Sequence, residues 1–599
     1  MRIFVCKLFE EKNAEQKIAK LISKERKRAN DLRLFCIDER IRERLESTGL
    51  PCKLLDDLCD EFTDEPSWER AFELSDRWRV SAENNDALNF YGTNFLECPV
   101  DYQVFVVKFA KLCQRLADQG CEVVVVVLNK YWNGRFPSIN STRMKTIVYG
   151  GAFKQGLARY ALFGLKAFIN RFKNQSRPSL NKRPKHIKLK DKGQKRALFV
   201  VSTYGPNINL YATPALAVID KCPSDGITPS VVVDNNRLVP IFRSKGVECT
   251  SIPTLPLSSI GKYFLLLYRL RKHVNALKAD DGQEGFSAEF LSKRMLFDTL
   301  PLLCYQALTG ISFFRRQFEV NPPDMICTIP DSSPEQRMAV AVARKHDIPS
   351  ITIQAANIFD HAAFGVKYLA ADMAAVMGET TRSYYLKRGI SSERVVVTGL
   401  AHFDHIFRRN GERDREVLSR YEIDPSKRII VFTTQHISIT VTLEIIRGIM
   451  DAVLKLKDSL LVIKVHPREE IQPYQRMVED YGDSRIHVVK DIDLYALLNN
   501  CQLLVTGFST TAVEAMMFDK PVIAVNLSEQ PEFLTYATEG AALGVYKYQD
   551  IEPAINKALF DEETRNELKQ RRDKFVYNYA YKTDGKASHR IVELMKEHL

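Results

Sequence analysis

A histidine and a group of hydroxyl side chains each follow a short apolar run near the C-terminal end of the chain. His466 comes directly after the run Leu461–Val465, and Ser509–Thr511 follow the run Leu503–Thr506. Ligands of open α/β sheets lie outside the carboxyl ends of the strands, so both groups would face one ligand. Hydroxyls and N–H groups at a helix start suit a phosphate, to which the histidine could also donate. The pattern predicts half of a nucleotide site.

A structural explanation competes with this interpretation. Thr511 and Glu514 have the spacing of a capping box, so the hydroxyl cluster could simply begin a helix. Pro467 would end the preceding strand in any protein, because it lacks a backbone N–H. The order of both groups within one βαβαβ pattern favours the nucleotide site. Thr434-Gln435-His436, after the strand expected at Arg428–Thr433, would add a third loop to it.

Three residues upstream are candidates for a general base, since removal of a hydroxyl proton needs a carboxylate or an imidazole. Asp331 follows the expected strand Met325–Ile329, and His361 follows the one ending at Gln354. Asp281 lies in an acidic loop after a helical stretch. Each could equally be a loop or turn residue, because a position at a strand end permits a catalytic role without establishing one.

Several common site motifs are absent from the sequence. No GxGxxG follows the first strand of the second α/β series, which argues against NAD or FAD binding. GxxxxGK[ST] and GxSxG are absent as well, which argues against P-loop NTPases and α/β-hydrolases. The 12 cysteines include no CxxC pair, and no metal-ligand spacing is present. We therefore expect no metal and no cofactor.

Two series of short apolar runs, separated by helical patterns, would position these residues. Such alternation predicts an α/β fold with two tandem doubly wound, Rossmann-like units, each with a parallel sheet. The first series of expected strands is 197–202, 229–233, 248–252, 325–329, 350–354, 374–378 and 395–399, with a long helical section over 260–318. After a helical linker over 405–421, the second series is 428–433, 460–465, 486–489, 503–506 and 522–525.

The expected domains follow from this pattern. They are an N-terminal α/β accessory domain (1–150), a basic helix and linker (151–196), the first Rossmann-like unit (197–410), the second unit (411–575) and a C-terminal helix that packs back across both (576–599). Residues 1–150 contain no chemical motif. Three or so domains suit a chain of 599 residues.

The positive charge is concentrated in one segment. The net charge is +12, and between Lys154 and Arg196 fourteen Lys or Arg residues face one acid, Asp191. The remainder is near neutral, which disfavours a nucleic-acid-binding protein with a broad basic face. Aromatic and apolar residues recur among these cations at helical spacing, which is typical of attachment to an anionic membrane surface. A helix packed on a neighbouring domain, followed by a plain linker, explains the segment equally well.

Four segments resemble a known family. Val397–Ile406, Val462–Glu469, Leu503–Val525 and Asp584–Ile591 are similar to GT-B glycosyltransferases of bacterial surface-polysaccharide synthesis. That group includes CDP-glycerol glycerophosphotransferases and the CMP-sialic acid and Kdo transferases. The resemblance implies a GT-B fold and a donor phosphate held by the His-Pro and Ser/Thr motifs, with Glu514 at the ribose or at the helix start. The expected nucleotide-binding residues are Gln435, His436, His466, Pro467, Ser509, Thr510, Thr511 and Glu514.

The resemblance also implies partners and a location. We expect a nucleotide-activated donor with a pyrimidine base, a glycan or glycolipid acceptor, and a transferase that joins them without a metal. We expect a cytoplasmic protein with peripheral attachment to the inner face of the membrane through 151–196. Glycerophosphotransferase relatives tend to have His-Gly where this chain has Ala355-Ala356, so their base does not carry over.

Two other functions stay open. A UDP-sugar 2-epimerase shares the two-unit plan, but the Thr-Glu-Arg-Pro-Glu segment characteristic of that family is missing. A GT-B module without activity could serve as a scaffold for polysaccharide assembly. The intact His-Pro and Ser/Thr motifs count against the scaffold.

Overall fold

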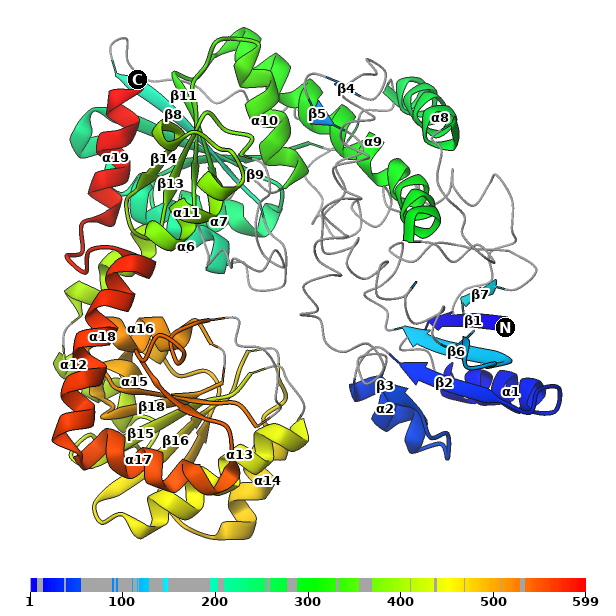
Figure 1. Ribbon diagram of the computed structural model, residues 1–599. Coiled ribbons are helices and arrows are strands. Elements are labelled where there is room, and N and C mark those ends of the chain that lie inside the picture. Colours follow the sequence, from blue (N-terminus) through cyan, green and yellow to red (C-terminus); the bar gives the residue numbers. More distant parts are fainter. Residues whose placement is uncertain are drawn as a thin grey trace.

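Two parallel sheets of the Rossmann type form the larger part of the protein in a computed structural model (Figure 1). The structure describes residues 2–7, 14–36, 39–54, 89–90, 93–94, 110, 116, 118–128, 144–148, 194–202, 209–253, 255, 259–276, 288–329, 333–354, 369–409, 411–435, 439–467, 469–507, 509–527 and 534–599. No helix among these residues is long and apolar enough to cross a membrane.

The N-terminal sheet is parallel, in the order β3-β2-β6-β1-β7. Its central strand β6 is a run of valines whose side chains are buried on both faces, as expected of a central parallel strand. The strands are β1 (Arg2–Lys7), β2 (Leu32–Cys36), β3 (Lys53–Leu54), β6 (Val123–Leu128) and β7 (Met144–Val148), with helices α1 (Ala14–Arg26) and α2 (Glu39–Glu46). The antiparallel pair β4 (Asn89–Phe90) and β5 (Thr93–Asn94) stands apart from this sheet.

The first Rossmann-like sheet has the order β10-β9-β8-β11-β12-β13-β14. Its strands are β8 (Lys195–Val201), β9 (Ile227–Val233), β10 (Glu248–Ser251), β11 (Met325–Ile329), β12 (Ser350–Ile353), β13 (Met373–Val376) and β14 (Val395–Val397). Its helices are α6 (Asn209–Ile219), α7 (Val239–Arg243), α8 (Ile260–Ala276), α9 (Ala288–Val320), α10 (Pro334–Arg344) and α11 (Glu379–Lys387), with 3-10 turns η2 (Cys222–Asp225), η3 (Asn236–Leu238) and η7 (Ser392–Arg394).

The second Rossmann-like sheet has the order β17-β16-β15-β18-β19-β20. Its strands are β15 (Arg428–Thr433), β16 (Ser459–Lys464), β17 (Ile486–Val489), β18 (Leu503–Thr506), β19 (Val522–Val525) and β20 (Leu543–Val545). Its helices are α12 (Gly411–Ser419), α13 (Ile439–Lys455), α14 (Gln472–Tyr481), α15 (Leu494–Asn500), α16 (Thr511–Met517) and α17 (Ile551–Phe560), with the 3-10 turn η9 (Tyr548–Asp550).

The C-terminal helices α18 (Glu562–Ala580) and α19 (Ala587–Glu597) join the two units. Figure 1 shows α18 beside the second unit and α19 beside the first. Side chains of α18 belong to the apolar core of the second unit, and side chains of α19 belong to that of the first. At the crossing, the Asp404 carboxylate of the 3-10 segment η8 (Ala401–Arg408) accepts the backbone N–H groups of Ala587 at 2.9 Å and Ser588 at 2.8 Å.

The predicted α/β fold with two tandem Rossmann-like units is confirmed by these two sheets. Three details differ from the expectation. The helical section expected over 260–318 is two helices, α8 and α9, and the linker expected over 405–421 is η8 followed by α12. The edge strand β20 was not predicted, because it is a three-residue segment with glycine at its centre.

Candidate functional site

Three loops meet at the point where the strand order of the second sheet reverses. The order β17-β16-β15-β18-β19 means that β15 lies between β16 and β18. His466, after β16, is therefore two strands from Ser509, after β18, and the loop after β15 that contains Gln435 lies between them. Ligands of doubly wound sheets bind at this reversal, outside the carboxyl ends of the strands.

Gln435 and Gly507 touch across the reversal point. A Cβ atom on Gly507 would overlap the side-chain oxygen of Gln435, so a larger residue at this position would force the end of the glutamine side chain to move. The Gly507 carbonyl in turn accepts the hydroxyl of buried Tyr536 at 2.7 Å. The end of β18 is thereby fixed against the end of β15.

A buried polar network supports the turn that contains His466. The Thr434 hydroxyl accepts the His466 backbone N–H at 2.8 Å and donates to the Glu469 carboxylate. Tyr474 donates its hydroxyl to the same carboxylate at 2.8 Å, and Lys490 donates to the Glu469 carbonyl at 2.6 Å. Thr434, Glu469 and Tyr474 are all buried, and burial together with the Glu469 carboxylate raises the pKa of Tyr474. A fully satisfied network of this kind makes the turn rigid.

Ser509 performs the capping that the sequence suggested for Thr511. Its hydroxyl accepts the Thr511 backbone N–H at 3.2 Å and donates to the Thr511 hydroxyl at 2.9 Å. The N-terminal boundary of α16 falls at Thr510, and no capping box between Thr511 and Glu514 is present. The capping box predicted for Thr511 and Glu514 is therefore wrong, since the N-cap residue is Thr510 without a capping side chain, and among the described side chains only the Ser509 hydroxyl binds a backbone N–H of the first turn.

Thr510 is the hydroxyl of this cluster that stays available. Among the described residues, its side chain makes no hydrogen bond, and neither do the backbone N–H groups of Ser509 and Thr510. The N–H groups of Ala512, Val513 and Glu514 are already used inside the turn. One hydroxyl and two backbone donors therefore remain for an anion, fewer than the sequence alone suggested.

Glu514 is a carboxyl group in an apolar setting. Its neighbours along α16, from Ala512 to Met516, belong to the core of the second unit, and burial raises the pKa of Glu514 to about 8. Burial is also the main reason why the pKa of Tyr495 is raised, and the Glu514 carboxylate raises it further. At neutral pH the Glu514 carboxyl is mostly protonated, so it can both donate and accept hydrogen bonds.

The candidate general bases are not among the described residues. Asp281, Asp331 and His361 lie outside them, as do His436 of the nucleotide loop and the basic segment over 151–193. Two residues after Asp331 in the sequence, the Ser333 hydroxyl donates to the Ser202 hydroxyl at 2.8 Å. This bond joins the residue after β8 to the start of α10. This is where the strand order of the first sheet reverses.

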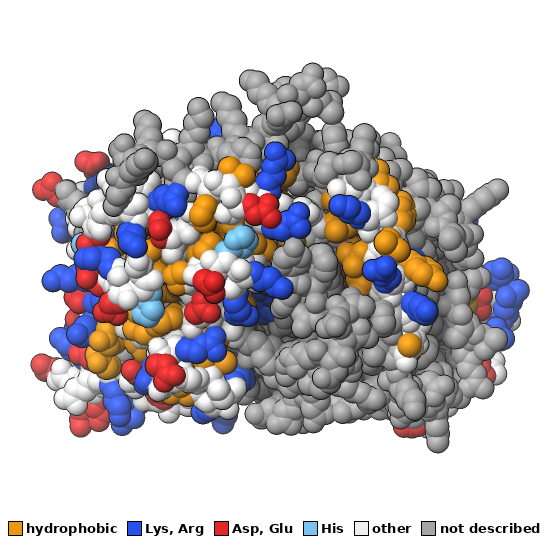
Figure 2. Space-filling model, turned by 90° about the horizontal axis from the view of Figure 1, so that it is seen from above, with side chains coloured by type: hydrophobic (Ala, Val, Ile, Leu, Met, Phe, Trp, Pro, Cys, Tyr) orange, Lys and Arg blue, Asp and Glu red, His pale blue; other side chains and the backbone are white. Residues whose placement is uncertain are grey.

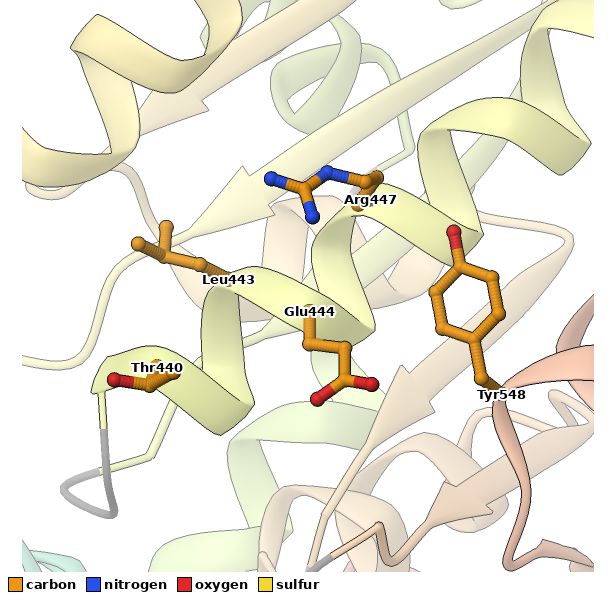
Figure 3. Close-up of a pocket in the computed structure, with 5 residues that line it drawn as sticks. All are labelled: Thr440, Leu443, Glu444, Arg447 and Tyr548. Carbon is orange, nitrogen blue, oxygen red and sulfur yellow. The ribbon is translucent and has the colours of Figure 1, made fainter.

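Beyond the predicted residues, the structure adds Glu469 and Tyr474, and it gives Thr434 of the predicted loop the role of a support for His466. Glu469 is the last residue of the Val462–Glu469 segment, which was the available signal for it. A pocket of about 450 Å³ lies beside α13 and is lined by Thr440, Leu443, Glu444, Arg447 and Tyr548 (Figure 3). No cluster of His, Cys, Asp and Glu suited to a metal occurs in the described part of the chain.

Residues 310–596 match the family model of UDP-N-acetylglucosamine 2-epimerase, from the middle of α9 to the end of α19. This is slightly less than half of the chain. The match supports an enzyme that acts on nucleotide sugars. It does not support the narrower resemblance to CDP-glycerol glycerophosphotransferases and the CMP-sialic acid and Kdo transferases. No curated protein matches the chain.

Solved structures with a distant likeness include both classes of enzyme. The UDP complex of MnaA from S. aureus is 16% identical, with 68% of this chain and 97% of that chain covered and a TM-score of 0.44. The UDP-GlcNAc 2-epimerase from Neisseria meningitidis bound to UDP-GlcNAc is 15% identical (67% and 100%, TM-score 0.47). A glycosyltransferase from Rickettsia africae is 12% identical (68% and 99%, TM-score 0.44).

The family match directs attention to residues 528–532. They read Ser-Glu-Gln-Pro-Glu, which differs from Thr-Glu-Arg-Pro-Glu by serine for threonine and glutamine for arginine. A segment related to the characteristic Thr-Glu-Arg-Pro-Glu therefore follows β19. The structure does not describe residues 528–532; the last described residue before them is Leu527. The main objection to an epimerase is weakened by this counterpart.

Proposed function

We propose that this chain is a UDP-sugar enzyme that inverts carbon 2 of a UDP-N-acetylhexosamine. The observation that carries the proposal is the family match over 310–596, which contains the predicted nucleotide-binding residues from Gln435 to Glu514. The convergence of their loops where the sheet order reverses supports it independently. The epimerase replaces glycosyl transfer as the leading interpretation.

In this proposal the diphosphate contacts the Thr510 hydroxyl and the free N–H groups of Ser509 and Thr510. His466, held by Thr434, donates to the same diphosphate. Hydrogen bonds to a charged phosphate are about twice as strong as neutral ones, which suits a group that must leave with its charge. The protonated Glu514 carboxyl would bind the ribose hydroxyls, since it can donate to one and accept from another. The nucleotide is a substrate, and the proposal includes no separate cofactor.

The chemistry explains why a leaving group would be held so firmly. The hydrogen on carbon 2 is not next to a carbonyl, so its loss as a proton is feasible only if negative charge leaves from a neighbouring atom. Departure of the diphosphate from carbon 1 meets this requirement, because the electrons of the C2–H bond then form a C1=C2 double bond. Protonation of carbon 2 on its other face and re-addition of the diphosphate to carbon 1 give the epimer. A base is then needed on the side of the first unit, and Asp331, Asp281 and His361 stay the candidates for it.

Glycosyl transfer is the second candidate, favoured by the four segments similar to GT-B transferases. It would use the same diphosphate contacts, with a glycan or glycolipid acceptor on the first unit. It predicts that UDP is released only when an acceptor is present. A cytoplasmic location suits both candidates, because nucleotide sugars are the substrates of each.

Incubation with UDP-N-acetylglucosamine in D2O, followed by proton NMR, tests the proposal. Epimerisation predicts deuterium at carbon 2 of the product and of the recovered substrate, together with signals of the C2 epimer. Release of UDP only after addition of a glycan or glycolipid acceptor, without exchange at carbon 2, would favour transfer and contradict epimerisation. If neither exchange nor release occurs while UDP still binds, epimerisation is wrong, and absence of release after addition of a glycan or glycolipid acceptor would exclude transfer as well.

A further inference from the structure

Helix α8 exposes an apolar and basic face that no described element covers. One side of the helix is buried, with Tyr263, Leu267, Leu270 and Val274 all less than a tenth exposed. Their spacing of four, three and four residues places them on one stripe of the helix. This stripe packs against α9, and Lys293 of α9 donates to the carbonyl of Asn275 at 2.9 Å. Packing and this hydrogen bond therefore hold α8 against α9.

The opposite side carries large apolar residues in contact with solvent. Phe264 is 44% exposed, Leu265 is 52% exposed and Tyr268 is 68% exposed. These three residues account for much of the exposed large apolar surface of the described chain, and they occupy adjacent positions of one helical face. An isolated exposed leucine needs no explanation, but a contiguous aromatic patch on one helix indicates a binding surface.

Basic side chains flank this patch, and acidic ones are absent from the helix. The exposed Lys262, Arg269 and Lys272 lie on the same side as Phe264, Leu265 and Tyr268, and the helix contains no Asp or Glu. Figure 2 shows hydrophobic and basic side chains next to one another on the right of the molecule, where Figure 1 shows the α8–α9 pair. The positive charge of this face favours an anionic partner.

We propose that this face of α8 docks onto an anionic lipid surface. Aromatic rings and leucine enter the boundary between headgroups and acyl chains, while Lys and Arg reach the phosphates above it. A second copy of the chain would bring like charges together, which disfavours self-association through this face. The face consists of residues other than those of the basic segment over 151–196 and of the nucleotide loops, so the proposal does not depend on the proposed function.

Co-sedimentation of the full chain with vesicles tests the proposal. Vesicles that contain phosphatidylglycerol should bind the protein, and vesicles of phosphatidylcholine alone should not. Leu265→Glu combined with Tyr268→Glu should abolish binding. Arg269→Gln combined with Lys272→Gln should weaken it by about fivefold for each charge removed, and high salt should have the same effect. All four side chains point into solvent, so the variants should keep the melting temperature.

Val320→Glu is the matched control, because Val320 is 60% exposed at the far end of α9 in the same unit. It should bind like the wild type. Undiminished binding of the Leu265→Glu/Tyr268→Glu variant would overturn the proposal and point to the 151–196 segment. Absence of binding to any vesicle would overturn it as well. So would a wild-type dimer, measured by light scattering, that the same double substitution converts to a monomer, since a second copy would then cover the face.

Discussion

The hydroxyl of Ser509 donates to the hydroxyl of Thr511 at 2.9 Å and accepts the Thr511 backbone N–H at 3.2 Å. Both interactions lie inside one turn, so Ser509 stabilises the start of α16 and has little capacity left for a ligand. The adjacent Thr510 makes no such bond among the described residues. Two neighbouring hydroxyls of one motif thus have different roles.

Replacement of Ser509 should act on stability. We expect Ser509→Ala to cost about 1 kcal/mol of unfolding free energy, the usual effect of a lost cap. The affinity for UDP should change by less than about threefold, because the two free N–H groups remain. Thermal melting and calorimetric titration of one preparation measure both quantities. An unchanged melting temperature with an affinity lowered tenfold or more would show that Ser509 binds the ligand.

Substitutions of His466 and of its support Thr434 should differ in their effects on kcat and on stability. His466→Ala should lower kcat by about 10²–10³, the range for loss of one preorganised donor to a developing charge, with little effect on stability. Thr434→Val keeps the shape but leaves the His466 N–H and the Glu469 carboxylate without their partner, so it should cost about 1–3 kcal/mol of stability. Its kcat should fall less than that of His466→Ala. A fully active His466→Ala variant would exclude this histidine from the reaction.

Glu514 should make stability depend on pH in a direction unusual for a carboxyl group. Its pKa of about 8 in the folded protein lies above the value in the unfolded chain, so the folded state binds the extra proton. The contribution is fully present below the unfolded pKa and is lost as the pH rises toward 8. Glu514→Gln should remove this loss and gain roughly 1–2 kcal/mol over the wild type at pH 8, after allowance for partial exposure.

Melting temperatures of the wild type and Glu514→Gln between pH 5 and pH 8 provide the measurement. The difference should grow with pH in favour of the variant. Glu514→Ala is the control for lost volume, since it removes the charge and the side chain together. Parallel curves for the wild type and Glu514→Gln would mean that Glu514 is ionised throughout the range.

Much of the framework could be predicted from sequence. Five strands, β11, β15, β17, β18 and β19, have the predicted bounds, and four of them are runs of largely buried residues, while β17 contains His487 and is only partly buried. The division of the section over 260–318 into α8 and α9 was not predicted, although the acidic loop that contains Asp281 lies between the two helices in the sequence. Pro301 inside α9 did not interrupt that helix either. Local patterns therefore define strands better than they define long helices.

The site could be predicted only in part. His466 and the hydroxyl cluster are local motifs, so they were visible in the sequence. The network of Thr434, Glu469 and Tyr474 was not, because it joins residues up to forty positions apart across β15 and β16. The division of roles between Ser509 and Thr510 depends on the backbone of a single turn. No spacing rule distinguishes two adjacent hydroxyls.

The central claim is that a pyrimidine nucleotide diphosphate binds where the order of the second sheet reverses, at Thr510. Calorimetric titration of UDP into the wild type, Thr510→Ala and Ser426→Ala tests it most directly. Ser426 carries an equivalent hydroxyl at the amino end of β15, on the opposite edge of the same sheet. We predict that Thr510→Ala binds UDP at least about tenfold more weakly, from the loss of a hydrogen bond to a charged group. Ser426→Ala should bind like the wild type, and GDP should bind more weakly than UDP. Equal UDP affinities for the wild type and Thr510→Ala, or a preference for GDP, would contradict the account.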